Sequence, residues 1–302
     1  MNDDTLSVPQ SGTVVAGVDG SVSARAAALW AADEARRSGR TLRLVHGASL
    51  DHLLRFAPAG AEDLLREAGR VCLAEARDAV HERHPALTVA RQLSRKGPVA
   101  ALLENARAPG DSIVVGSRGL GGFGSLLLGS VSMDVAAHAP VPVVVVRGER
   151  ERPETSVITA CVGRTEYAGW VRHAAREASL RKATLRLLNV WNPLSAVGTV
   201  ATMLDGMDDL VRQRIHRVGV LADTLREENP GLTVETEVEP ARSTAGLLVE
   251  ASRHSDLLLA GRRRVRPGLG PLLGHVPHTL LHHAHCPVEI LPRDDEPGRE
   301  EP

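Results

Sequence analysis

The stretch that decides the fold opens with Ile113-Val-Val-Gly116-Ser-Arg118-Gly119, continues through Gly129-Ser130-Val131 and closes with Pro142-Val-Val-Val-Val146. An apolar run that stops at a glycine is typical of a buried strand, and a glycine-rich loop follows it here. Glycines let the backbone approach an oxyanion closely, and a helix start offers unpaired N–H groups and a positive dipole end. Ser130 and Ser132 can add hydroxyl donors, and Arg118 can add charge. The stretch therefore predicts a phosphate-binding loop, with glycines that only shape a loop as the alternative.

Strands alternate with helices along the residues around this stretch. Ser21 or Ser23 is expected to cap a helix that runs to about Ser38 and stops at Gly39. Further helices are expected at about 62–84 and from Pro98, and strands at 13–18, 41–46, 87–93, 113–115 and 141–146. This alternation predicts an α/β fold with a parallel sheet covered on both faces.

The second half of the chain repeats the first. Thr41-Leu-Arg-Leu44 recurs as Thr184-Leu-Arg-Leu187, and Asp111-Ser-Ile-Val-Val-Gly116 as Asp256-Leu-Leu-Leu-Ala-Gly261. The offset is about 143 residues early in the chain and about 145 late, which indicates a tandem duplication of a whole domain. We expect one domain at 1–148, a second at 156–293, and a charged tail at 294–302.

The spacing Gly116-x2-Gly119-x9-Gly129-Ser130 resembles the ATP-binding motif of the universal stress protein family, G-x2-G-x9-G-S/T. The opening Val14-Val-Ala-Gly-Val-Asp19-Gly-Ser21 fits that family too, and the chain as a whole looks like a tandem-domain member. The resemblance implies two Rossmann-like domains of the adenine nucleotide alpha hydrolase-like kind. Each would have a five-stranded parallel sheet of order 3-2-1-4-5 with helices on both faces. Ligands in such sheets bind beyond the carboxyl ends of strands 1 and 4, where the strand order reverses.

The ligand implied by this resemblance is ATP, with Mg²⁺ as an optional companion. Asp19 could accept hydrogen bonds from the nucleotide, or it could cap a helix. Val45 would offer backbone groups to the adenine edge, or be ordinary strand core, and Arg118 would neutralise phosphate or be a solvated surface residue. The expected contact residues are Gly17, Val18, Asp19, Val45, Val115, Gly116, Arg118, Gly119, Gly129, Ser130 and Val131.

The second repeat departs from the motif. Val162 is expected in the place of Asp19, Arg264 in that of Gly119, and His275 in that of Ser130, while Pro267 and Pro271 stiffen the loop. A bulky residue at 264 should fill the space that a phosphate needs. We therefore expect the second domain to be empty, with an anion held differently by Arg262-Arg-Arg264 as the alternative.

Histidines gather near the end of the second repeat. His275, His278 and His282 lie at i, i+3 and i+7, which places them on one face of a helix, with His283, His285 and Cys286 close by. Three imidazoles on one stripe could bind Zn²⁺ or sense pH. Partly exposed helical histidines without a ligand are the favoured interpretation.

Composition excludes several classes of function. The net charge is −1 and aromatics make up 2% of residues, so neither a nucleic-acid partner nor a membrane partner is expected. Cys72, Cys161 and Cys286 are few, odd in number and scattered, and the start lacks an apolar signal segment. The chain is therefore expected in the cytoplasm.

No catalytic motif accompanies the glycine loop. The sequence lacks G-x4-G-K-S/T, G-x-S-x-G and H-E-x-x-H. The leading hypothesis is therefore an ATP-binding regulatory protein of the stress response, with a protein partner that the sequence does not identify. A slow ATPase and a nucleotide-independent scaffold are the alternatives.

The last strand of each repeat is expected to be an apolar edge that invites pairing. The resemblance implies that domains pair through it, Val143–Val146 with Val288–Leu291. The two halves would then form an intramolecular pseudo-dimer, with a homodimer as a further possibility.

Overall fold

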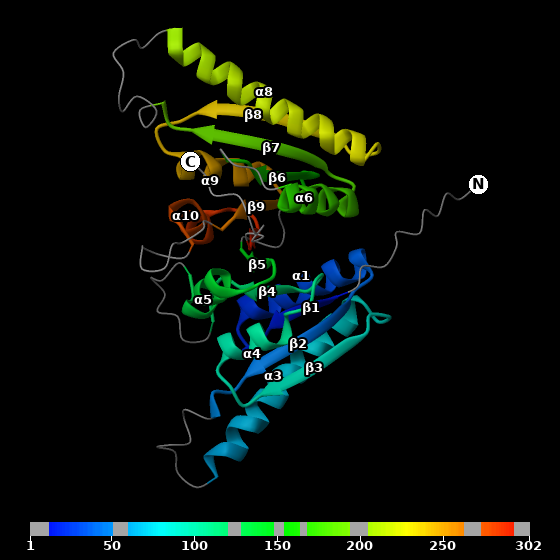
Figure 1. The fold of residues 1–302 in the computed structure, drawn as a ribbon. Coiled ribbons are helices and arrows are strands. Elements are labelled where there is room, and N and C mark those ends of the chain that lie inside the picture. The colour runs from blue at the N-terminus through cyan, green and yellow to red at the C-terminus, as the bar shows by residue number, and fades with distance from the viewer. Residues whose placement is uncertain are drawn as a thin grey trace, which may run out of the picture. The chain divides into compact units, whose positions relative to one another are not determined.

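The computed structural model describes residues 12–50, 60–119, 128–147, 154–163, 168–193, 205–262 and 273–292. The chain divides into two compact units, Met1–Arg150 and Glu151–Pro302. Each unit alternates strands with helices, as Figure 1 shows, so the predicted α/β class is confirmed.

The predicted helices and strands of the first unit are confirmed, with ends shifted by one or two residues. Its described elements are β1 (Thr13–Gly17), α1 (Val22–Ser38), β2 (Thr41–Gly47), α3 (Ala61–Arg83), β3 (Val89–Ser94), α4 (Pro98–Asn105), β4 (Ser112–Gly116), α5 (Ser130–His138) and β5 (Val143–Val146).

The strands of the first unit are parallel and lie in the order β3-β2-β1-β4-β5. Ala16 of β1 stands opposite Leu44 of β2 on one side and Val114 of β4 on the other. The order therefore reverses between β1 and β4, and the carboxyl ends of these two neighbours meet at one edge of the sheet.

Helices cover both faces of this sheet because successive side chains of a strand point to opposite sides. Arg43 of β2 reaches Asn105 of α4, whereas the ring of His46 lies against Gly69 of α3. α1 packs beside α3, and α4 beside α5. The core lies between these layers, where Val14, Val15 and Ala16 have no exposed surface.

The first helix begins and ends at predicted residues. The hydroxyl of Ser21 accepts a hydrogen bond from the Ala24 N–H at 3.1 Å, so Ser21 rather than Ser23 is the N-cap. Gly39 follows the helix with φ of 68°, a left-handed conformation that favours glycine.

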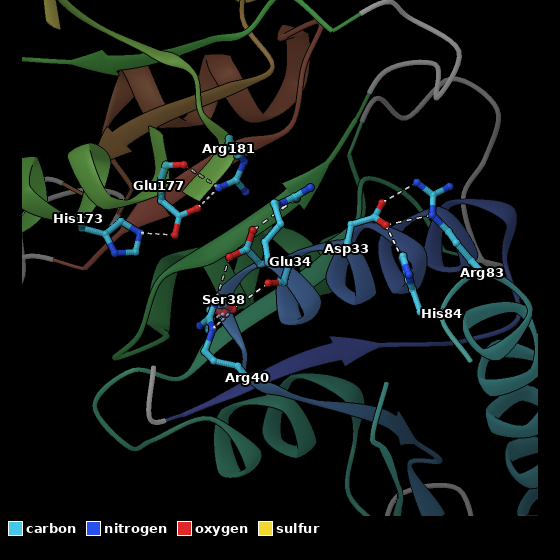
Figure 2. A network of polar contacts seen from close by, with 11 residues as sticks. Asp33, Glu34, Ser38, Arg40, Arg83, His84, His173, Glu177 and Arg181 are labelled. Atoms are coloured by element: carbon cyan, nitrogen blue, oxygen red, sulfur yellow. Dashed lines mark hydrogen bonds and ion pairs between the residues drawn. The ribbon is translucent and has the colours of Figure 1, made fainter. Parts of the chain in front are cut away.

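A buried ion pair ties the end of α1 to the amino end of β4 (Figure 2). Arg40 donates to Glu34 Oε1 at 3.0 Å, to the Gly110 carbonyl at 2.9 Å and to Ser112 Oγ at 3.1 Å. Both charged side chains are buried, so this pair fixes the strand whose other end carries the glycine loop.

The second unit repeats the architecture. Its strands are parallel in the order β10-β9-β6-β7-β8. Its described elements are β6 (Val157–Cys161), α6 (Ala168–Arg181), β7 (Thr184–Trp191), α8 (Asp205–Glu228), β8 (Val234–Pro240), α9 (Thr244–Ala251), η1 (Ser252–His254), β9 (Leu257–Gly261), α10 (His275–His283) and β10 (Val288–Leu291).

Candidate functional site

Asp19 lies just beyond the carboxyl end of β1. Its Oδ1 accepts a hydrogen bond from the Ser21 N–H at 2.9 Å, which bends the chain into α1. Because Ser21 is the N-cap, the alternative that Asp19 caps the helix is wrong. The carboxylate is partly exposed at the point where the two strand ends meet.

The glycine loop after β4 lies against the start of α1. A Cβ on Gly116 would stand 2.5 Å from Ser23 Oγ, and one on Gly119 would stand 2.5 Å from Asp19 Oδ2. The Arg118 N–H donates to Ser23 Oγ at 3.2 Å. Two of the predicted site residues, Asp19 and Gly119, are thus brought into contact although 100 positions separate them in the sequence.

The start of α5 offers fewer phosphate donors than predicted. The Gly129 N–H donates to the Ser117 carbonyl at 2.8 Å, so it is paired within the protein and the predicted contact of Gly129 with phosphate would have to use other atoms. Ser132 turns toward the sheet, is buried and donates to the Gly116 carbonyl at 2.6 Å, so its predicted role as a donor is wrong. The N–H groups of Ser130 and Val131 remain in the first turn, and no side chain of the described residues caps it.

Among the described residues, none gives Gly129 a steric reason to be a glycine. Its φ is −80°, and an added Cβ would approach the nearest described atoms, in residues 117–119, only to 3.7 Å. That is ordinary van der Waals contact, unlike the 2.5 Å clashes at Gly116 and Gly119. A missing side chain here leaves the helix start open to a ligand.

Two guanidinium groups lie near this loop. Arg118 is exposed, and Arg147 follows β5 directly. Burial lowers the pKa of Arg147, and the charge of Arg118 lowers that pKa further. Arg147 does not stand out in the sequence because it comes first in a charged linker; its position directly after a buried strand is the signal that could have identified it.

The remaining predicted residues belong to the sheet. The Val45 carbonyl accepts from the Val18 N–H at 3.0 Å, which leaves one lone pair for a ligand. Gly17 makes room for packing, since an added Cβ would stand 3.2 Å from Leu102 and 3.3 Å from Val115. Val18, Val45 and Val115 are buried, so any contact with a ligand would be through the backbone.

Cys72 of α3 lies beside the same turn. A Cβ on Gly20 would stand 3.9 Å from its Sγ. Burial, followed by the charges of Asp19 and Glu75, raises the pKa of this thiol to about 11. The thiol is therefore protonated near neutral pH and is a poor nucleophile.

The strand registers correct one predicted correspondence. Gly17 stands opposite Val45, and Cys161 stands opposite Leu188. The next residue donates to the second strand in each unit, Val18 to Val45 and Val162 to Leu188, both at 3.0 Å. Val162 therefore corresponds to Val18, and Gly163 takes the place of Asp19. The predicted match of Val162 with Asp19 was wrong because the connection between the first two strands is one residue shorter in the second unit.

The helix start of the second unit also differs. Gly274, which precedes α10, has φ of 74° and ψ of 165°, whereas Gly129 has φ of −80°. Exposed His275 occupies the first helical position, where the first unit has Ser130. Arg264, Pro267 and Pro271 lie outside the described residues.

The histidines of α10 make ring contacts with one another, and the ring centroids of His282 and His283 lie 6.0 Å apart at 40°. The ring centroids of His278 and His282 lie 4.6 Å apart at 30°. Within the described ranges, no three His, Cys, Asp or Glu side chains are grouped closely enough to hold a metal ion.

These features are typical of one class of protein. A reversal of strand order, a glycine loop and an open helix start at one sheet edge are typical of α/β proteins that bind nucleotides or other phosphates. The Universal stress protein family model matches residues 11–147 and 157–292, and the chain belongs to this family.

Proteins similar to this chain match either nearly all of it or about one half. A universal stress protein of Mycobacterium tuberculosis is 33% identical over 291 residues, which are 94% of this chain and 98% of that protein. A universal stress protein from Archaeoglobus fulgidus superposes on 95% of this chain and 98% of its own with a TM-score of 0.67, at 16% identity. A universal stress protein solved in complex with cAMP is 28% identical and covers 46% of this chain and 98% of its own, with a TM-score of 0.35.

None of the described helices is long and apolar enough to span a membrane.

Proposed function

We propose that this chain is an ATP-binding regulatory protein of the stress response that holds the nucleotide in its first unit. The observation that carries the proposal is the contact between Asp19 and Gly119 beside a helix start that no described side chain caps. Gly116 and Gly119 serve the packing of the protein itself, whereas no described residue requires a glycine at 129, and an approaching phosphate would account for it.

The charges support an anionic ligand. Arg118 and Arg147 repel each other enough to affect the pKa of Arg147, and a phosphate between them would relieve that repulsion. The N–H groups of Ser130 and Val131 would meet the phosphates, and Asp19 would accept from the nucleoside. Mg²⁺ would accompany the phosphates as an optional ion.

Regulation would act through a protein partner that distinguishes the nucleotide-bound state from the empty state. The last strands of the two halves would pair in a pseudo-dimer or between copies. A cytoplasmic protein of this kind needs no catalytic residues.

A slow ATPase is the second candidate. Hydrolysis needs a group that orients water at the γ-phosphate. Asp19 is the one acidic side chain that the contacts above bring to the loop, and it already accepts from Ser21.

Two measurements separate these functions. The small molecule released from denatured, purified protein should have the mass of an adenine nucleotide, and a chain that carries and binds none would support a scaffold. Phosphate release by wild-type protein above that of Gly119→Glu would establish the ATPase and overturn the non-enzymatic proposal.

A further inference from the structure

The end of β1 is held by a side chain that the motif does not include. His46, near the carboxyl end of β2, has its Nδ1 2.9 Å from the Val18 carbonyl. A carbonyl can only accept, so Nδ1 carries the proton and donates. Val18 precedes Asp19, and this bond therefore fixes the peptide unit that joins them.

Helix α3, which packs on this face of the sheet, leaves space for the His46 ring. Gly69 lies in the interior of α3, where glycine costs about 1 kcal/mol relative to alanine. A Cβ there would stand 2.9 Å from Cδ2 of His46 and 2.6 Å from Cδ1 of Leu93. The helix thus keeps a destabilising residue where the imidazole lies.

In the second unit, a different side chain bonds to the corresponding carbonyl. Asn189 Nδ2 donates to the Val162 carbonyl at 2.9 Å and to the Gly163 carbonyl at 3.3 Å. Asn189 corresponds to His46 because it follows Leu188 as His46 follows Val45.

The helix residue that faces this side chain is small in the first unit and large in the second. The ends of α3 and α8 correspond through the bonds His84 N–H to Val80 and Asn229 N–H to Leu225, which aligns Gly69 with Arg214. Arg214 extends to Asn189 Oδ1 at 3.4 Å. A large ring beside a glycine in one unit thus matches a small amide beside an arginine in the other.

We infer that His46 is a positioning residue of the proposed nucleotide site: it fixes the Val18 carbonyl, and through it the turn that presents Asp19. This inference rests on the proposed function, since the site it serves is the proposed ATP site. The bond it describes exists without ligand.

The test compares three variants of the full chain. His46→Leu keeps apolar bulk but removes the donor. His46→Asn keeps a donor the same number of bonds from the backbone, as in the second unit. Gly69→Ala leaves His46 in place but crowds its ring. Circular dichroism and the thermal midpoint confirm that each variant is folded.

Two readouts are measured. Loss of one hydrogen bond that orders a ligand contact corresponds to roughly a tenfold loss of ATP affinity in His46→Leu, with a smaller loss in Gly69→Ala. His46→Asn should stay within about threefold of wild type. Without nucleotide, hydrogen exchange at the Ser21 amide, which donates to Asp19, should quicken in His46→Leu and not in His46→Asn.

The outcomes separate the two proposals. If wild type binds no ATP, the proposed function fails, and the exchange readout still decides the role of His46. A folded His46→Leu with wild-type exchange and, where wild type binds ATP, wild-type affinity overturns the positioning role. So does His46→Asn that behaves like His46→Leu.

Discussion

At the scale of single residues, the site depends on the space that Gly119 leaves for Asp19. An added Cβ at 119 would stand 2.5 Å from the Asp19 carboxylate, a distance that folded proteins essentially never show. Either the loop or Asp19 must move when a side chain is added, and both carry groups that the nucleotide would contact.

Gly119→Ala should therefore weaken ATP binding, and Gly119→Glu, which adds charge where phosphate belongs, should abolish it at ordinary concentrations. Gly219→Glu is the matched control, because that glycine lies in α8 with no described atom within 4 Å of an added Cβ. Calorimetric titration measures all three. Unchanged affinity in folded Gly119→Glu would remove the basis for the assigned site.

His173 predicts a pH dependence of stability. Burial lowers its pKa, but Glu289, at 2.8 Å, and Glu177 outweigh burial and raise the pKa to about 9 (Figure 2 shows His173 beside Glu177). A group with a raised pKa stabilises fully below its unfolded value of 6.5, and this contribution is lost as pH rises through 9. The loss is at most about 3 kcal/mol.

Urea denaturation between pH 6 and 9.5 checks this prediction. The wild type should lose stability across that window, and His173→Gln should start lower and change less. Parallel profiles for the two proteins would show that the His173 ion pair does not link stability to pH.

The residue-scale predictions had physical limits. Glycine spacing revealed where a backbone must approach something, but not which N–H groups the protein uses itself. The direction of Ser132 depends on how α5 is rotated toward the sheet, and the place of Gly163 depends on strand register. Neither follows from the residues of one segment.

At the scale of elements, sequence patterns were sufficient to predict the helices and strands of the first unit. Apolar runs ending at glycine predicted β1 and β4, and Ser21, Gly39 and Pro98 marked helix ends because caps are local chemistry. The buried contact of Arg40 with Glu34 was not predictable, since it joins a helix end to a distant strand.

Removing that contact should destabilise the first unit. Arg40→Ala leaves the Glu34 carboxylate buried with weaker compensation from Arg37 at 3.5 Å, and should cost about 3 kcal/mol. Arg70→Ala, which breaks an exposed pair with Glu67, should cost less than about 1 kcal/mol. Equal denaturation midpoints for the two variants would contradict the role given to Arg40.

The proposed pairing through β5 is tested best by a proline at a chosen position of this strand. The carbonyls of Pro142 and Val146 accept from β4, so the backbone groups of Val144 also face β4 and those of Val145 face away. Val145→Pro removes an N–H that faces away from β4, whereas Val144→Pro removes one that faces β4 and breaks the unit's own sheet.

Val145→Pro should lower the mass measured by light scattering if copies of the chain pair through β5. If the two halves of one chain pair, the thermal midpoint should fall instead and aggregation should increase. Wild-type mass and midpoint together would exclude pairing through this strand.

At the scale of the whole molecule, duplication has given two units with one architecture and different chemistry. The first unit has Asp19, Gly119 and Ser130 at its sheet edge, and the second has Gly163 and His275 with a different backbone at Gly274. The family and the repeat were readable from the sequence. Which unit holds nucleotide is a matter of these few positions, and the proposal assigns it to the first.

Calorimetric titration of nucleotide-stripped full-length protein with ATP tests this assignment most directly. Losing an acceptor and a hydroxyl donor at one site is worth a few powers of ten in affinity, enough to leave the second unit empty. The account predicts one ATP per chain, bound by wild type and by Gly219→Glu but not by Gly119→Glu. Two equivalent sites, or a single site that survives Gly119→Glu, would contradict it.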